Sequence, residues 1–111
     1  MSVLHTYLVI NALVGVQNYG NTVPNNYSLS QNYPNPFNPV TQIKFDIAKQ
    51  GFVTLKIYDV LGREMSKLVS EVKSPGSYIV DFDGTKLSSG VYFYKLESGT
   101  FNDVKRMVLI K

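Results

Sequence analysis

Cysteine is absent from this 111-residue sequence, and His5 is its only histidine. Without cysteine the chain can form no disulfide, no thiolate zinc site and no cysteine nucleophile. His5 has no acidic residue near it in the sequence, so a serine–histidine–aspartate arrangement has no evident members. No glycine-rich phosphate loop is present either. These absences predict a protein that is not an enzyme and that binds no cofactor.

Asp81 and Asp83 give a weak hint of calcium binding, because carboxylates two residues apart can share an oxygen-rich site. An EF-hand loop that began at Asp81 would need glycine at position 86 and glutamate at position 92. Lys86 and Tyr92 stand there instead. We therefore expect no metal site, and interpret the two aspartates as a solvated strand end.

Charge is missing from the first part of the chain, since no Asp, Glu, Lys or Arg precedes Lys44. The 11 basic and 8 acidic residues that follow give a net charge of +3. The basic residues are spread among the acids, and only Lys105 and Arg106 are adjacent. Nucleic-acid binding usually requires a clustered basic patch. The scattered pattern predicts no nucleic-acid partner.

The apolar stretch at residues 3–16 resembles the middle of a signal peptide, but no Lys or Arg precedes it and no cleavage site is clear. It is shorter than the roughly 20 apolar residues that a spanning helix needs, so we expect no membrane-spanning segment. Residues 18–26 are rich in asparagine, which is typical of turns and linkers. We expect an uncharged N-terminal strand and linker at residues 1–26 and one domain at residues 27–111.

Strict alternation of apolar and polar residues predicts half-buried strands. The expected inward-facing triplets are Ile43, Phe45 and Ile47; Val53, Leu55 and Ile57; and Tyr78, Val80 and Phe82. Residues 91–97 and 101–111, joined by Ser98 and Gly99, have the pattern of a hairpin, and residues 27–31 could form a short strand. The apolar residues of segment 64–72 would suit a helical face or an irregular strand, and the neighbouring strands favour the latter: Met65, Leu68, Val69 and Val72.

About seven short strands with no convincing helix predict an all-β, antiparallel, immunoglobulin-like β-sandwich.

Leu87 stands alone in the polar loop 83–90, so we expect it to be buried. The prolines and asparagines of loop 32–39 (NYPNPFNP) predict a rigid conformation. Segment 59–63 (DVLGR) predicts a turn with a left-handed glycine. Tyr92 and Tyr94 are expected to pack across strands rather than to form a carbohydrate platform. The structural motif residues are thus Asn35, Pro36, Phe37, Asn38, Pro39, Asp59, Gly62, Arg63, Gly90 and Tyr92.

Four motifs occur in one order: YSLSQNYPNPFNP at residues 27–39, IYDVLGR at 57–63, SGVYFY at 89–94 and KRMVLIK at 105–111. Together they resemble the C-terminal secretion domain of type IX secretion cargo, the type A sorting domain of Bacteroidetes and related bacteria. The resemblance covers about residues 27–111. A weaker resemblance, to the immunoglobulin-like domain of flagellar hook-capping proteins, lacks NYPNPFNP.

The type IX resemblance implies a non-catalytic sorting and anchoring domain that the outer-membrane translocon recognises after export through the periplasm. It also implies a sortase-like peptidase that removes the domain and either releases the cargo or attaches it to lipopolysaccharide at the cell surface. The closing strand matches the family's terminal signal, which assigns translocon recognition to Arg106, Met107, Val108, Leu109, Ile110 and Lys111. Loop 32–39 could contact the translocon directly or serve only the fold.

Only about 26 residues precede the domain, so the sequence is either a piece of a large secreted cargo or a small product in itself. In the second case the alternative is an extracellular structural subunit, whose β-prone N-terminal stretch completes a neighbour's sheet and builds a filament. The opposite hypothesis is that this strand folds onto its own sandwich. Light scattering on the full chain and on the chain without residues 1–17 separates these two hypotheses. If both chains are monomers, the filament hypothesis is excluded. The self-assembly residues would be Tyr7, Leu8, Val9, Ile10, Leu13 and Val14.

Overall fold

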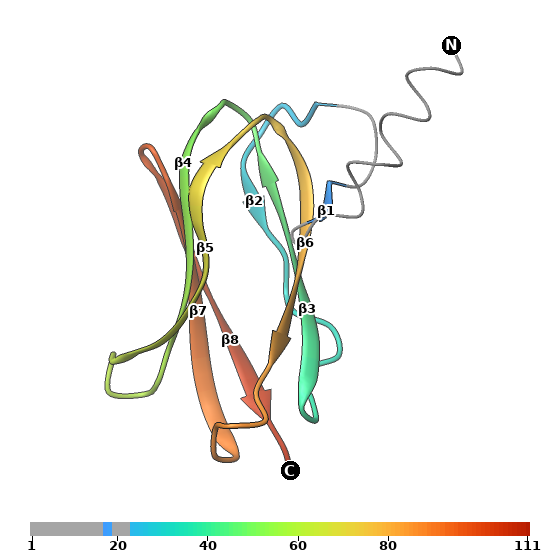
Figure 1. Ribbon diagram of the computed structural model, residues 1–111, viewed down its shortest axis with the longest axis vertical. Helices are drawn as coiled ribbons and strands as arrows, with labels where there is room; N and C mark the ends of the chain where they lie inside the picture. The colour runs from blue at the N-terminus through green and yellow to red at the C-terminus, as the bar shows by residue number, and fades with distance from the viewer. Residues whose placement is uncertain (1–16, 19–22) are drawn as a thin grey trace, which may run out of the picture.

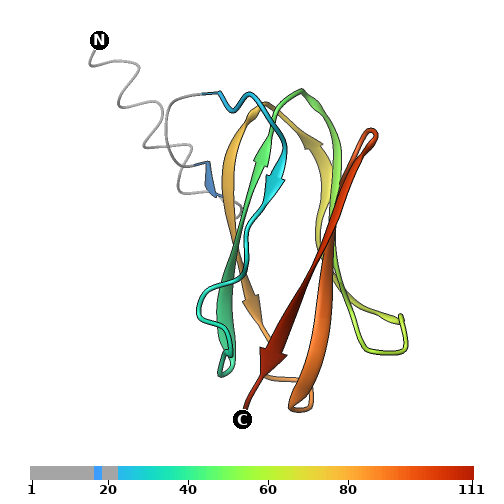
Figure 2. The same ribbon diagram turned by 180° about the vertical axis from the view of Figure 1, so that it is seen from behind.

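The computed structural model describes residues 17–18 and 23–111, and all regular elements in this part of the chain are strands. They form two four-stranded antiparallel sheets, ordered β1-β6-β3-β2 and β5-β4-β7-β8. Figures 1 and 2 show the sheets facing each other as the two layers of a sandwich. The strands are β1 (Gln17–Asn18), β2 (Ser28–Leu29), β3 (Val40–Ile47), β4 (Gly51–Tyr58), β5 (Glu64–Lys73), β6 (Gly76–Asp83), β7 (Gly90–Ser98) and β8 (Phe101–Leu109).

The strand order is that of an immunoglobulin-like sandwich. If β2, β3 and β6 are strands A, B and E, and β4, β7 and β8 are C, F and G, then β5 takes the place of an added strand beside C. A tyrosine corner supports this correspondence. The Tyr92 hydroxyl, near the start of β7, donates a 2.7 Å hydrogen bond to the Ser88 carbonyl four residues upstream. The predicted fold class is confirmed.

The inner faces of the two sheets form one apolar core. All three predicted triplets are buried in it, because alternation turns every second side chain of a strand toward the opposite sheet. Burying one such side chain stabilises a fold by about 1.5–3 kcal/mol. β7 and β8 complete the core with Tyr92, Tyr94, Leu96, Met107 and Leu109.

β5 is a strand, as its neighbours favoured, but it is irregular. Two register shifts interrupt its pairing with β4. Of its four apolar residues, Val69 is buried and Leu68 packs against the core, whereas Met65 and Val72 are exposed. β5 is the outermost strand of its sheet. Met65 lies at a register shift, and Val72 pairs with the exposed Phe52 on the outer face of the sheet.

Three shorter segments differ in detail from the predicted elements. The strand expected at residues 27–31 is limited to Ser28–Leu29, and Asn18, expected in the linker, pairs with Tyr78 of β6. Leu87 is half-buried, and it packs against the core as expected. Within the described residues, no helix has the length and apolar character to cross a membrane.

Candidate functional site: the motif end

The four motifs lie far apart in the sequence, but each has a part at one end of the sandwich, where residue 111 also lies (Figure 1). The Gly84 N–H donates a 2.8 Å hydrogen bond to the Pro39 carbonyl and joins the proline loop to the β6–β7 loop. The Lys111 N–H donates to Ser89 Oγ at 3.0 Å and joins the end of the chain to the same loop. We name this region the motif end and define it as residues 33–39, 59–63, 84–90 and 106–111.

The proline loop, residues 33–39, covers the outer edge of β8. β8 is the last strand of its sheet, and an uncovered strand edge invites pairing with other chains. The Phe37 N–H donates to the Val108 carbonyl and the Ile110 N–H donates to the Phe37 carbonyl, both at 2.9 Å. Asn35 Oδ1 accepts the Val108 N–H at 3.0 Å. The backbone of the proposed recognition segment is therefore bonded to the loop that precedes β3.

The Phe37 side chain anchors this loop in the core. The ring is 1% exposed and meets Phe82 edge to face, with 6.0 Å between ring centroids. Gly84 leaves the space that the ring needs, because a Cβ at that position would lie 3.2 Å from both Phe37 Cε2 and Leu109 Cδ2. The loop, β8 and the chain after β6 thus meet around one aromatic ring.

A buried polar network holds the start of the loop. The Tyr94 hydroxyl donates to the Ser30 carbonyl and accepts the Asn32 N–H, both at 2.7 Å. Asn32 Nδ2 donates to Thr41 Oγ1 at 3.0 Å and to the Pro34 carbonyl at 3.1 Å. Burial raises the pKa of Tyr94 to about 12, because its phenolate would lose its hydration in the core.

Sequence reasoning missed several residues that connect the loop to the two sheets. Gln31 Nε2 donates to Asn32 Oδ1 and to the Arg106 carbonyl, both at 2.7 Å. Arg106 lies 75 positions further along the chain, so no local pattern indicates the contact. The only signal in the sequence was a run of polar residues beside the prolines. The missed residues are Gln31, Asn32, Thr41 and Gly84.

The β4–β5 turn is fixed by the carboxylate of Asp59. Its Oδ1 accepts the N–H groups of Leu61 and Arg63, both at 2.9 Å, and its Oδ2 accepts Arg63 Nε at 2.6 Å. The Gly62 N–H donates to the Asp59 carbonyl at 3.0 Å. Gly62 has a φ of 82°, a left-handed conformation that glycine adopts at low cost. The hydrogen bond from the Arg63 N–H is the main cause that holds the pKa of Asp59 below its ordinary 3.8.

Replacing Asp59 with asparagine should lower the thermal unfolding midpoint at neutral pH and have less effect in acid. Because the pKa of Asp59 is lower in the fold than in the unfolded chain, its contribution is fully present above pH 3.8 and is lost as pH falls through the folded pKa. Midpoints of wild type and Asp59→Asn should therefore converge below about pH 4. Asp81→Asn, which alters an exposed contact with Gln42, is the control. A midpoint difference that does not change with pH would contradict this assignment.

The recognition segment ends against the β6–β7 loop. Lys111 Nζ donates to the Thr85 carbonyl at 2.5 Å, in addition to the backbone contact with Ser89. The Thr85 hydroxyl donates to Asp83 Oδ1, and this hydrogen bond is the main cause that lowers the pKa of Asp83. Lys111 is thus held by two hydrogen bonds, one from its backbone N–H and one from its side chain.

The six proposed recognition residues differ in exposure. Met107 and Leu109 are buried in the core, because alternation along β8 turns them inward. Val108 is half-buried. The side chains that lie open to a partner are those of Arg106, Ile110 and Lys111.

The remaining predicted residues fall into two groups. Gly90 begins β7 with a φ of 154°. The rings of Tyr92 and Tyr94 are both buried, so these two rings do not form a carbohydrate platform on the surface. In residues 23–111, no group of three or more His, Asp or Glu side chains could hold a metal ion. The proposed self-assembly residues lie outside the described residues, as does His5: Tyr7, Leu8, Val9, Ile10, Leu13 and Val14.

The fold and the motif end together define an immunoglobulin-like module with its last strand fastened by a proline loop. The sequence pattern of the secretion system C-terminal sorting domain matches residues 31–111. The chain belongs to this family, and membership gives it a C-terminal sorting role in type IX secretion. Secretion to the cell surface and interaction with the type IX machinery follow from that role. Comparison with curated proteins and with solved structures finds no match.

Proposed function

We propose that the domain acts without catalysis as an address that the outer-membrane translocon reads in its folded form, after the chain has crossed the periplasm. The observation that carries this proposal is that parts of all four motifs lie at one end of the sandwich, where the proline loop and the β6–β7 loop contact residues 108–111. A signal that the translocon read from the unfolded sequence would not require the fold to bring these motifs to one end. A sortase-like peptidase then separates the domain from its cargo at the cell surface.

The exposed side chains of the recognition segment are the ones that the translocon would contact: Arg106, Ile110 and Lys111. Removing all six residues 106–111 is a poor test, because it also removes the core residues Met107 and Leu109. Loss of export would then report unfolding. Changes confined to exposed side chains separate recognition from folding.

Fusing the 111-residue chain to the C-terminus of a periplasmic reporter should direct the reporter out of a bacterium that has type IX secretion. Arg106→Gln combined with Ile110→Ser and Lys111→Gln, which keeps the backbone contacts of residues 110 and 111, should lower the exported fraction at least about tenfold, the effect of roughly 1.4 kcal/mol of binding free energy. Export is measured as reporter activity outside the cell relative to the periplasm. Lys49→Gln is the control, because Lys49 is exposed in the β3–β4 turn, and this turn lies at the opposite end of the sandwich (Figure 1). A folded wild-type fusion that stays in the periplasm would overturn the proposal.

The filament hypothesis stays a prediction. Its strand lies among residues 3–16, outside the described part of the chain. The light-scattering comparison given above tests it independently of export.

A further inference from the structure

Two large apolar side chains stand exposed in the β4–β5 turn of the motif end. Val60 is 66% exposed and Leu61 is 74% exposed. Central positions of turns are usually occupied by Gly, Asn, Asp, Ser or Pro. The turn takes its shape from the hydrogen bonds among Asp59, Gly62 and Arg63, and Leu61 contributes to them through its backbone N–H rather than its side chain. The fold therefore does not require either side chain.

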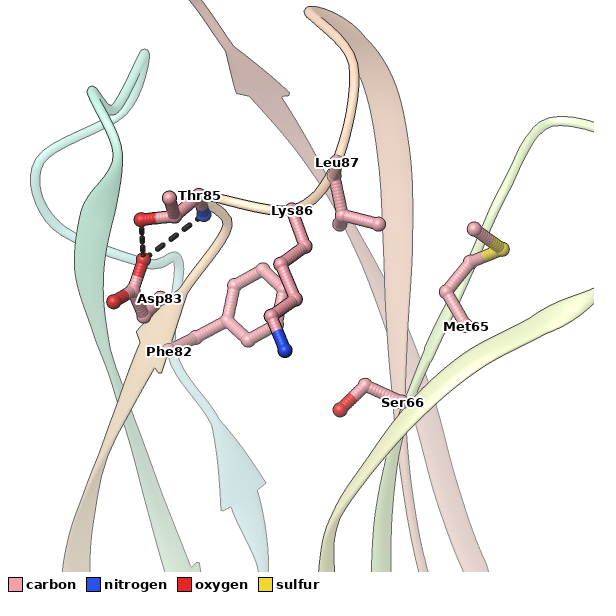
Figure 3. A pocket seen from close by; sticks show the side chains of 7 residues that line it. All are labelled: Met65, Ser66, Phe82, Asp83, Thr85, Lys86 and Leu87. Atoms are coloured by element: carbon pink, nitrogen blue, oxygen red, sulfur yellow. Dashed lines mark hydrogen bonds between the residues drawn. The ribbon is translucent and has the colours of Figure 1, made fainter.

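A hollow surface lies directly beside this turn. One hollow of about 400 Å³ is lined by the turn and by the chain from Lys86 to Tyr92. A second, of about 500 Å³, adjoins it and shares Met65, Lys86 and Leu87 with it. Figure 3 shows Met65 of β5 and Leu87 of the β6–β7 loop on opposite sides of this second hollow. Exposed apolar side chains thus border a concave surface, which is the shape that receives side chains of a partner.

The charges around this surface indicate the chemistry of its occupant. Lys86 is exposed at its rim, as is Arg63, whose guanidinium is already paired with Asp59 at 2.6 Å. The nearby carboxylates are engaged, since Asp59 accepts three hydrogen bonds and Asp83 is bonded to Thr85. Within residues 23–111, no ion pair is formed by Lys86. A carboxylate beside an apolar side chain would complement both features.

We propose that Val60, Leu61 and the adjoining hollow form a docking surface for an apolar segment with acidic neighbours on a protein of the type IX machinery. The inference rests on the proposed sorting function and adds a second contact to that of the recognition segment. A second copy of this chain fits less well, because a symmetric contact would bring the Lys86 side chains of both copies together. The turn and the recognition segment lie at the same end (Figure 1), so one partner can reach both.

The test uses the reporter fusion of the 111-residue chain. Val60→Ser combined with Leu61→Ser should lower export at least about tenfold while the thermal unfolding midpoint of the purified chain stays unchanged. The matched control is Phe52→Ser combined with Val72→Ser, a cross-strand pair that is 55% and 60% exposed at the opposite end of the same sheet. Lys86→Glu should lower export as well, whereas Lys49→Glu should not.

The outcomes separate the two proposals. A wild-type fusion that is not exported contradicts the sorting function itself. Wild-type export with equal export of the Val60→Ser, Leu61→Ser variant contradicts only the docking surface. A photo-crosslinking amino acid at position 61, but not at position 52, should form an adduct with a type IX outer-membrane component identified by mass spectrometry. An adduct with a second copy of the chain, or with lipopolysaccharide, would overturn the proposed occupant.

Discussion

Replacing Phe37 with alanine is expected to lower the free energy of unfolding by about 3–5 kcal/mol, the range for truncating a buried phenylalanine. The ring is buried against Phe82, and Gly84 and Leu109 pack close to it. Close-packed neighbours collapse only in part into such a cavity. A domain has only about 5–15 kcal/mol of stability in total. The variant should therefore be near the limit of folding.

Chemical denaturation of the purified chain measures this loss, as the change in the denaturant midpoint at constant slope. The control is Tyr33→Ala, because Tyr33 lies in the same loop but is 81% exposed. That change should stay within about 0.5 kcal/mol of wild type. Phe37→Leu keeps more of the side-chain volume and should lie between the two. A Phe37→Ala variant within about 1 kcal/mol of wild type would show that the loop does not depend on its ring.

Replacing Tyr94 with phenylalanine should cost about 2–4 kcal/mol, although it removes a single oxygen atom. The buried Asn32 N–H and the partly buried Ser30 carbonyl both lose their partner, and an unsatisfied buried polar group costs roughly 1–3 kcal/mol. Tyr92→Phe is the matched control, because the Tyr92 hydroxyl donates one partly buried hydrogen bond, to the Ser88 carbonyl. It should cost about 1 kcal/mol, the value of an ordinary hydrogen bond.

The same hydroxyl should produce an alkaline transition. The pKa of Tyr94 is raised from 10.0 to about 12 in the fold, mainly by burial. A group with a raised pKa contributes stability that is fully present below its unfolded pKa and is lost as pH rises through its folded pKa. The stability difference between wild type and Tyr94→Phe should therefore shrink between pH 10 and about pH 12. A constant difference across that window would mean that the phenol ionises without penalty.

Much of the fold could be predicted because alternation is a local property. Ile43, Phe45 and Ile47 are buried as expected, since each lies two residues from the next on one face of β3. The same reasoning failed at Met65 and Val72 of β5. Two register shifts lie between Val69 and Glu64 and take Met65 out of the alternation, which the local pattern does not show. Val72 lies three positions from the buried Val69 and pairs with the exposed Phe52, so it is on the outer face of the sheet.

The candidate site was predictable only in parts. The motifs named Phe37, Asp59 and the closing strand, but they did not show that loop 33–39 binds the edge of β8. Nor did they distinguish Val60 and Leu61 from residues that merely complete a turn. That distinction needs their exposure and the hollow beside them.

The sequence by itself determined the long strands, the inward faces of β3, β4 and β6 and the family of the chain, because periodicity and motif order are read along the chain. Only the tertiary structure decided which motif contacts which. The partners Gln31 and Arg106 are 75 positions apart, and Asn32 and Tyr94 are 62 positions apart. Such pairs meet because two sheets must close over one core. The physical reason is that the burial and hydrogen-bonding of a polar loop residue depend on the packing of the whole sandwich, whereas the alternation of a strand depends only on its own backbone.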